Sequence, residues 1–206
     1  MRLSIPEAFT GFVVGSLGTL RTAQPDLIVE VLIDDQNANL DRGTADLALR
    51  MGPVRQRRLI RRSLGNFGWS LYAEKRLARA RRLWPWIPGA DFGVIGYHEK
   101  LAHSPGAQWI AANVEARQIV FRCNSLLAAL SGAVAGLGVA ALPCFLGAAE
   151  PTLLRVTPEV IGRREAMLVV HPDRQKIGRV RALLEHLRGI ATANAVTLRG
   201  EGAGYD

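Results

Sequence analysis

The sequence predicts an α/β fold, on three observations. Apolar, β-branched segments such as LIVEVLI (27–33) have the character of buried strands. Segments with helical periodicity, such as RVRALLEHLRGI (179–190), alternate with them along the chain. The 206 residues are 49% hydrophobic, enough for one large domain or two small ones with cores of their own. Strands that alternate with helices favour parallel pairing through right-handed crossovers.

The first part of the chain reads as two strand–helix units. We expect a strand at RLSI (2–5), a helix from about Pro6 to Leu20, a strand at 27–33 and a short polar helix at 37–42. DRGTADLALRMGP (41–53) then predicts a strand that ends at Gly52-Pro53, because proline cannot donate to a sheet ladder. Alternation should direct Leu47, Leu49 and Met51 to a packed face and Asp46, Ala48 and Arg50 to a semi-polar one.

The second part predicts further strands and helices. Strands are expected at 67–73, 94–98, 117–123, 138–143 and 164–172, with a basic helix from Lys75. An apolar helix is expected at 124–137, ending in a left-handed cap at Gly136 and Gly138. In the helix at 179–190, Val180, Leu183, Leu184 and Leu187 form one stripe. The tail 193–206 is predicted to be disordered.

The order of these elements suggests a chain that leaves one lobe and later returns to it. We place the crossings near Ala73 and Arg164. Lobe I would then comprise 1–73 plus 165–192, and lobe II 74–164.

Composition excludes several classes of protein. No stretch approaches the roughly 18 uninterrupted apolar residues of a membrane span, and no secretory leader opens the chain, so a cytoplasmic protein is expected. Cys123 and Cys144 are too few for a disulfide framework and are expected to be free thiols. The net charge of +8 comes from arginine clusters at 54–62 and 75–83, which we interpret as solvated faces rather than DNA contacts.

Two helix starts are candidate anion sites. Ser4 and Glu7 have capping-box spacing, and Asn124 or Ser125 can cap the helix that follows Cys123. First-turn amides lack intrahelical partners and attract a carboxylate or phosphate. Ligands of open α/β sheets bind at the carboxyl ends of strands, where Met51-Gly52 and Leu142-Pro143 are expected.

The sequence gives no positive sign of catalysis, of a cofactor or of a metal site. The four histidines lack metal-ligand spacing, and the two cysteines form no CxxC motif. No nucleophile-elbow motif is present, and GAVAGLG follows a helix and precedes a strand, the reverse of a dinucleotide loop. Cys123 and Trp69 are interpreted as buried packing residues, and Trp84 and Trp86 as turn anchors.

Five segments in order, RLSIPEAF, DRGTADLALRMGP, LYAEKRLAR, NSLLAALSGAVAGLGVAALP and VVHPDRQKIGRVRALLEHL, resemble the effector-binding domain of LysR-type transcriptional regulators. The resemblance covers the chain to about residue 190. It implies two Rossmann-like lobes joined by two crossover strands, the architecture of type II periplasmic binding proteins. The N-terminal helix-turn-helix DNA-binding domain of the family is absent from this chain, so any DNA contact would be made through that missing domain.

The resemblance also implies a site and partners. A small-molecule effector, a carboxylate or an aromatic, would bind between the lobes. By position, its contacts would be Ser4, Ile5, Pro6, Glu7, Arg50, Met51, Gly52, Cys123, Asn124, Ser125, Leu142 and Pro143. Ile5 and Glu7 depart from the small or hydroxyl residues frequent at these positions, and Cys123 is an unusual ligand contact, which leaves the effector's charge open. The family commonly forms homodimers through this domain and tetramers at full length.

Two alternatives remain from the sequence. A transport-type solute-binding protein of the same fold would carry a secretory or lipoprotein leader in the full gene. An enzyme built on this fold would need a titratable pair in the cleft, and the sequence offers none that we can name.

Overall fold

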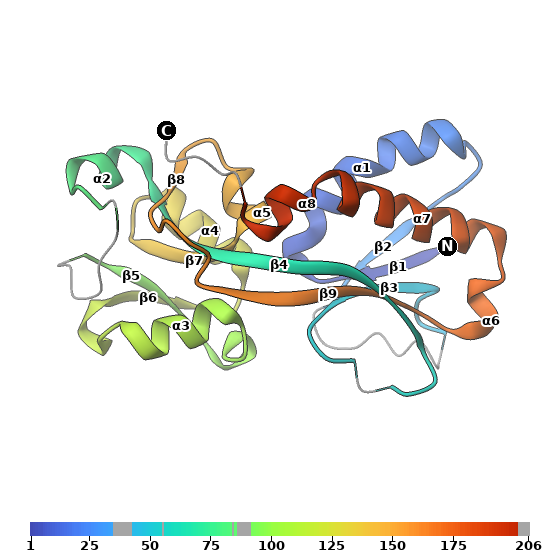
Figure 1. The fold of residues 1–206 in the computed structure, drawn as a ribbon, viewed down its shortest axis with the longest axis horizontal. Helices are drawn as coiled ribbons and strands as arrows, with labels where there is room; N and C mark the ends of the chain where they lie inside the picture. The colour runs from blue at the N-terminus through green and yellow to red at the C-terminus, as the bar shows by residue number, and fades with distance from the viewer. Residues whose placement is uncertain (35–42, 55, 84, 86–91, 202–206) are drawn as a thin grey trace. The chain divides into compact units, whose positions relative to one another are not determined.

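The computed structural model describes residues 1–34, 43–54, 56–83, 85 and 92–201. These residues divide into two compact units. Unit 1 contains the described residues of 1–66 and 165–195, and unit 2 those of 67–164 and 196–201. Each unit contains parallel β-strands with helices packed against them (Figure 1). The chain passes between the units after residues 66, 164 and 195, whereas the sequence predicted passages near Ala73 and Arg164 only.

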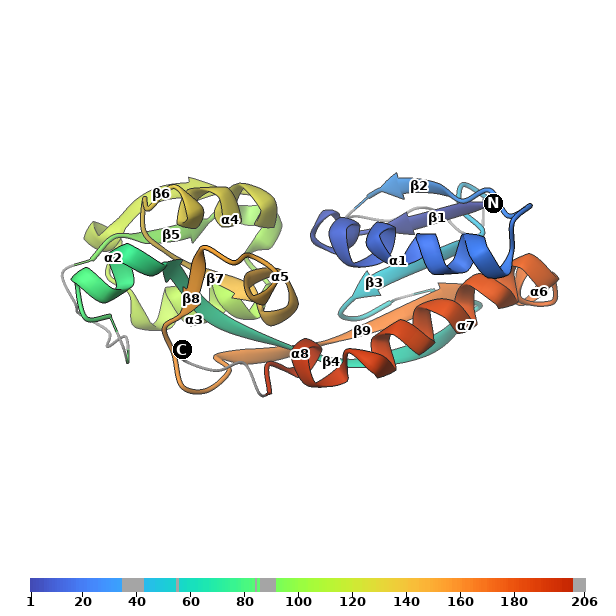
Figure 2. The same ribbon diagram turned by 90° about the horizontal axis from the view of Figure 1, so that it is seen from above.

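Unit 1 is built around three parallel strands. β1 (Arg2–Ile5) pairs with β2 (Glu30–Ile33) on one side and with β3 (Leu47–Met51) on the other. A 3-10 turn, η1 (Glu7–Phe9), leads into α1 (Thr10–Ala23), and α7 (Gly178–Ala193) lies beside α1 (Figure 2). The His186 Nε2 and Ser16 Oγ atoms, 3.1 Å apart, join these two helices. The short helix expected at 37–42 lies outside the described residues.

The amphipathic stripe predicted for α7 is confirmed. Val180, Leu183, Leu184 and Leu187 are all buried, at most 3% exposed. Burying a leucine or valine side chain contributes about 1.5–3 kcal/mol, so the stripe is a large part of what holds α7 on unit 1.

The face predictions for β3 are only half right. Leu47 and Leu49 are buried as expected, but Ala48, assigned to the semi-polar face, is also fully buried. It belongs to a small core cluster with Leu59, Met167 and Val169. Strand β9 (Gly162–Val170), which pairs antiparallel with β3, supplies two members of this cluster, so both faces of β3 are covered.

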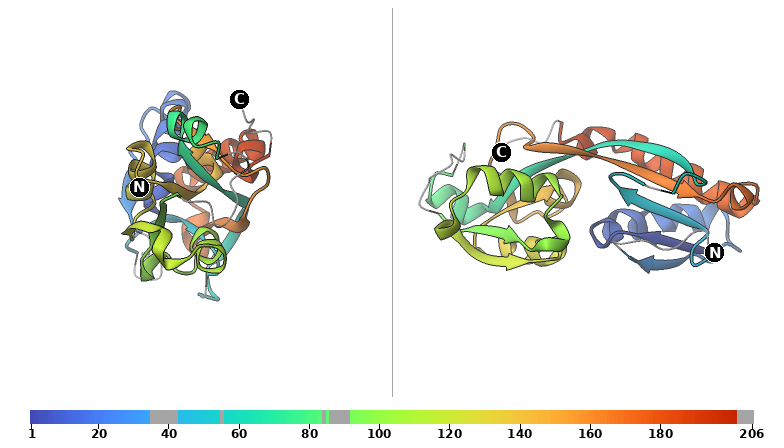
Figure 3. Two further views of the ribbon diagram at one scale, coloured as in Figure 1. Left: turned by 90° about the vertical axis from the view of Figure 1, so that its left-hand side faces the viewer. Right: turned by 90° about the horizontal axis from the view of Figure 1, so that it is seen from below.

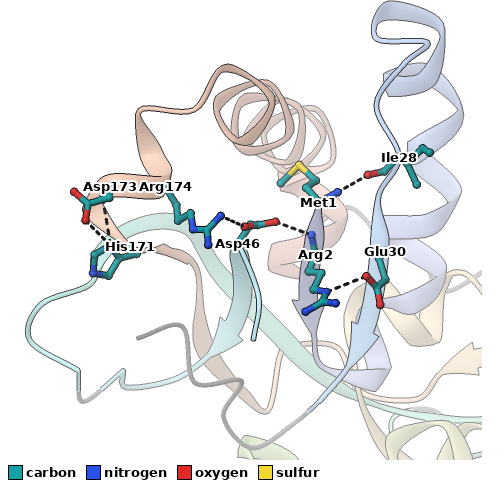
Figure 4. A network of polar contacts seen from close by, with 8 residues as sticks. All are labelled: Met1, Arg2, Ile28, Glu30, Asp46, His171, Asp173 and Arg174. Atoms are coloured by element: carbon teal, nitrogen blue, oxygen red, sulfur yellow. Dashed lines mark hydrogen bonds and ion pairs between the residues drawn. The ribbon is translucent and has the colours of Figure 1, made fainter. Parts of the chain in front are cut away.

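Asp46 holds together the amino ends of the strands of unit 1 (Figure 4). One carboxylate oxygen accepts the Arg2 backbone N–H at 2.9 Å, and the other lies 3.0 Å from Nη1 of Arg174. Arg2 also donates from Nε to Glu30 at 3.0 Å. Arg174 lies in α6 (Pro172–Gln175), which His171 caps through its Nδ1 atom. Asp46 therefore stabilises the amino ends of these strands, at the opposite end of β3 from Arg50.

Unit 2 contains a second set of three parallel strands. β5 (Val94–Tyr97) pairs with β6 (Ile119–Cys123) and with β7 (Val139–Pro143). α3 (Pro105–Asn113) and α4 (Leu126–Val134) lie on opposite sides of these strands (Figure 1). Val94 packs in one core cluster with Ile110 of α3, while Ile95, on the other face of β5, contacts Gly132 of α4. The remaining short elements are α2 (Lys75–Ala80), η3 (Glu99–Leu101), η4 (Ala116–Gln118), α5 (Cys144–Ala148) and β8 (Leu153–Arg155).

Two long strands belong to both units. β4 (Ile60–Glu74) runs beside β9 (Figure 3), and in unit 2 it also pairs antiparallel with β7 and β8. The sequence predicted only its second half, 67–73. The first half contains Arg61, Arg62 and Ser63, all exposed, and so lacks the apolar alternation that marks a half-buried strand.

The predicted left-handed cap after α4 is confirmed at Gly136, although the helix itself ends at Val134. Gly136 has φ +74°, in the left-handed region that glycine adopts without strain. The Leu137 N–H donates to Gly132 O and the Gly136 N–H to Ala133 O, both at 3.0 Å, which is the Schellman pattern.

The tail predicted to be disordered is helical in its described part. α8 (Ala195–Arg199) packs in unit 2 with Leu198 only 2% exposed. The buried Arg155 donates from Nη1 to Gly200 O at 2.7 Å. The composition of the tail could not predict this contact, because Arg155 lies 45 residues earlier in the sequence. Residues 202–206 lie outside the described part.

Candidate functional site

In unit 1, the strand-to-helix connection after β1 carries Ser4, Ile5, Pro6 and Glu7. Ser4 and Ile5 are fully buried, and Pro6 and Glu7 are half-buried. Pro6, not Ser4, is the N-cap of the first turn, and it makes no side-chain capping bond. The predicted Ser4–Glu7 capping box is therefore wrong, because Ser4 is still part of the strand. The turn is instead closed by the Thr10 hydroxyl, which donates to Glu7 O at 2.7 Å.

Arg50 at the end of β3 contacts this connection directly. Its Nη2 donates to Ser4 Oγ at 2.9 Å, and its Nη1 donates to Leu49 O at 2.7 Å and to Ser4 O at 3.4 Å. Ser4 pairs with Ala48 between the parallel strands, so β1 and β3 bring the two side chains together at their carboxyl ends. Arg50 is half-buried and places a cation at this edge of unit 1.

The chain leaves the sheet after Met51 as the sequence predicted. Gly52 is buried and has φ +86°, a value that costs a residue with a side chain about 1 kcal/mol. Its N–H donates to Glu165 O at 2.8 Å. The structure thus brings Ser4, Ile5, Arg50, Met51 and Gly52 to one end of the unit 1 sheet, with Pro6 and Glu7 following β1.

In unit 2, Cys123, Asn124 and Ser125 connect β6 to α4. Ser125 is the N-cap, and its Oγ accepts the Ala128 N–H at 3.1 Å, which resolves the open choice between Asn124 and Ser125. Asn124 is exposed, and the buried Cys123 thiol donates to Ser125 O at 3.3 Å. The expectation that Cys123 is a buried packing residue is confirmed.

Leu142 and Pro143 end β7, which pairs with the other side of β5, and both are buried. Pro143 pairs with Trp69 of β4, whose ring contacts Gly106 in the first turn of α3. The buried Trp69 confirms the interpretation of this residue as core. Its indole N–H has no hydrogen-bond acceptor among the described residues.

Two further groups lie at these strand ends that the sequence analysis did not single out. Tyr97 ends β5 in register with Cys123, and its hydroxyl donates to Ala141 O of β7. Burial raises the pKa of the Tyr97 phenol above its ordinary value, and the adjacent Cys123 adds to the rise, so the phenol is a neutral donor. Ser104 caps α3 by accepting the Ala107 N–H at 3.1 Å. The Ser-Pro pair at 104–105, a common helix start, was the available signal for α3.

The strand-end groups of unit 1 and unit 2 contain the same kinds of chemical group. Each combines backbone amides, hydroxyl groups and apolar walls, and unit 1 adds one cation. Within the ranges that the structure describes, no three His, Cys, Asp or Glu side chains gather in a way that could hold a metal ion. Nor is any described helix long and apolar enough to cross a membrane.

Comparison with known proteins identifies the family. The family model described as the LysR substrate binding domain matches residues 1–191. The chain belongs to the LysR substrate-binding domain family. This match covers the two strand-end groups described above, from Ser4 through Pro143.

Solved structures of LysR-type regulators share the fold of this LysR substrate-binding domain. The CrgA regulatory domain from Neisseria meningitidis superposes with a TM-score of 0.73 at 18% identity, covering 92% of this chain and 97% of that one. The AmpR effector-binding domain from Citrobacter freundii gives 0.74 at 15% identity over 94% and 98%. The AphB regulatory domain from Vibrio vulnificus gives 0.67 at 20% identity over 92% and 97%.

A curated relative points to the same kind of protein. This chain is 27% identical over 188 residues to an uncharacterized HTH-type transcriptional regulator of Haemophilus influenzae. The match spans 85% of this chain and 63% of the relative. The relatives are regulators rather than enzymes, and the family match favours the regulatory interpretation over the transport-type solute-binding protein.

Proposed function

We propose that this chain senses a small-molecule effector for a LysR-type transcription factor, with both strand-end groups contacting the effector. Unit 1 would contribute Ser4–Glu7 and Arg50–Gly52, and unit 2 Cys123–Ser125 with Leu142 and Pro143. The observation that carries the proposal is that each group lies at the carboxyl ends of parallel strands in its own unit. Ligands of open α/β sheets bind at such ends.

An effector with a carboxylate is the better match of the two classes expected. Arg50 offers a half-buried guanidinium, and the first turn of α4 offers amides with a positive dipole end. Glu7 opposes an anion in unit 1, so we propose that the carboxylate lies against Arg50 or the start of α4. An aromatic or aliphatic body would lie against the apolar residues of the two groups.

The proposal is tested by thermal unfolding of the chain with paired ligands. Benzoate and benzamide have the same ring and differ in charge, and a wider panel of small acids and their amides extends the comparison. At one hundred times its dissociation constant, a true effector stabilises the fold by about 2.7 kcal/mol. Acids should stabilise and amides should not, and the shift should shrink in Ser125→Ala and Arg50→Gln. The exposed Arg57→Gln in unit 1 is the matched charge control.

Transmission to DNA follows from linkage in the full-length protein. An effector shifts the balance between two arrangements of the units by no more than its differential affinity for them. DNA-binding domains attached to the chain would then change their spacing. A full-length protein whose promoter footprint is unaltered by an acid that binds this domain would contradict this part of the proposal. The full-length protein would act in the cytoplasm.

We also propose that the domain forms a homodimer and, at full length, a tetramer. β2 is the last strand of its sheet, and Ile28 before it is 80% exposed. Ile33 on β2 and Val14 on α1 are 50% and 46% exposed, so unit 1 exposes large apolar side chains on β2, before it and on α1. Sedimentation should show a dimer that Ile28→Lys dissociates. Val196→Lys, at a similarly exposed residue of unit 2, should leave the dimer intact.

A further inference from the structure

A cavity of about 560 Å³ lies at the opposite end of the unit 2 sheet from Cys123 and Pro143. Gly93 precedes β5, Gln118 precedes β6, and Gly136 and Leu137 precede β7, and all four line the cavity. The cavity therefore lies at the amino ends of the three parallel strands. Its volume is within the usual range of about 300–1,000 Å³ for small-molecule sites.

The walls of this cavity expose apolar side chains to solvent. Val120 is 56% exposed and Leu137 is 54% exposed, and both belong to the small set of large hydrophobic residues that are exposed in the described part of the chain. Leu77 and Phe92 extend the apolar lining. Gly93, which lines the cavity, packs so closely against Val120 and the Leu137 carbonyl that a side chain would not fit at this position. An apolar ligand body would cover surface that is otherwise in water.

Two arginines line the same cavity. The Arg117 side chain is 75% exposed, and its Nε donates to Glu115 at 2.7 Å. The Arg81 side chain makes no hydrogen bond or ion pair with another described residue. The cavity thus combines apolar walls with two guanidinium groups, of which that of Arg117 is paired with Glu115.

An unusual turn fixes the position of Arg81. Arg82 has φ +51°, the only non-glycine residue of the described chain in the left-handed region. The Arg82 N–H donates to Arg79 O at 3.2 Å and the Leu83 N–H to Ala78 O at 2.9 Å, a Schellman ending in which glycine is the usual residue. A left-handed arginine costs about 1 kcal/mol or more and persists only where the surroundings hold it. Here the buried Leu83 does so.

We propose that this cavity is a second ligand site, separate from the effector site, and that it binds a small carboxylate with an apolar body. The carboxylate would lie between Arg81 and Arg117, and the body would cover Val120, Leu137 and Phe92. The ends of α2 and α4 oppose an anion, because a helix C-terminus carries roughly half a negative charge. The full charges of the two guanidinium groups outweigh these partial charges, and guanidinium matches a carboxylate in geometry.

Octanoate is the test ligand, with octylammonium and octanol as matched probes of the same chain length. Isothermal titration on the 206-residue chain should show binding of octanoate and weaker or no binding of the other two. Arg81→Gln should weaken octanoate binding by about tenfold, the cost of one charge-assisted contact, and Arg81→Gln with Arg117→Gln by more. Leu137→Glu, which adds a carboxylate to the exposed wall, should abolish it.

The matched control is Arg76→Gln, which removes the same charge from α2, the helix that Arg81 follows, at an exposed residue outside the cavity lining. It should change the affinity by no more than about twofold at physiological salt, where exposed charges are screened. Amide chemical shifts should move at Gly93, Gly136 and Leu137.

Three results would overturn the proposal. They are an affinity that is unchanged in the double variant, an equal loss in Arg76→Gln, and shift changes confined to Gly52 and Ser125. The last result would assign octanoate to the effector site and would leave the proposed function standing.

Discussion

The two strand-to-helix connections of this domain look alike in sequence and differ in how they are held. In unit 2, Ser125 caps α4 within four residues of itself, with its Oγ on the Ala128 N–H. In unit 1, Ser4 is a buried strand residue whose Oγ accepts from Arg50, 46 residues away. The unit 2 connection is held by a contact that is local in sequence, and the unit 1 connection by a long-range contact. A serine three residues before a helix former is therefore a reliable cap only where the strand has already ended.

Replacing Arg50 should have the largest effect on the unit 1 connection. Arg50→Met removes the donor to the buried Ser4 Oγ and should lower the free energy of unfolding by about 1–3 kcal/mol. It should also weaken stabilisation by a carboxylate effector that lies against Arg50. Urea unfolding of Arg50→Met, Ser4→Ala and the double variant measures their coupling energy. Strictly additive losses would contradict the contact, and Arg57→Met controls for loss of an arginine.

The unit 2 connection should respond to its cap alone. Ser125→Ala should cost about 1 kcal/mol, because the Ala128 N–H loses its acceptor. Ser125→Asp should restore this stability and yet weaken carboxylate binding, since it places a negative charge beside the ligand. Ser131→Ala, in the exposed middle of the same helix, should be neutral or slightly stabilising. Denaturant midpoints at constant slope provide the measurement.

Alkaline pH should weaken unit 2 before unit 1. Burial raises the pKa of the Cys144 thiol, and burial also raises that of the Tyr97 phenol. Above about pH 8.5 the unfolded thiol ionises while the folded thiol keeps its proton, so the unfolded state binds fewer protons and stability falls as pH rises. Cys144→Ala should flatten this fall relative to wild type between about pH 8.5 and pH 10. If the stability of Cys144→Ala fell with pH as steeply as that of the wild type, the Cys144 thiol would not be the cause of the fall.

Glu7 should matter least for stability. Because the structure has no capping box at Ser4, Glu7→Gln should lower the free energy of unfolding by less than the roughly 1 kcal/mol that a lost helix cap costs. A loss near 1 kcal/mol would restore the cap interpretation. The same variant should strengthen carboxylate binding if Glu7 opposes the effector, which titration of wild type and variant would detect.

Local signals in the sequence were enough for much of the fold. The stripe of α7, the Schellman end of α4 and the break at Gly52 all depend on residues within a few positions of one another, and all are confirmed. The errors share another cause. The capping role given to Ser4, the polar face given to Ala48 and the short β4 failed because Arg50, Leu59 and β9 are distant in sequence. Tyr97 and Trp69 likewise joined the candidate site only through strand pairing.

The contact of Arg155 with Gly200 sets a practical limit on where this domain can be cut. The family match stops at residue 191, yet the interior of unit 2 is completed by Leu198 and by Gly200, against which Cys144 packs so closely that no side chain fits there. A chain shortened at 191 would expose the Cys144 surface and strip a buried guanidinium of a carbonyl acceptor. A chain that keeps these contacts must extend through at least residue 200.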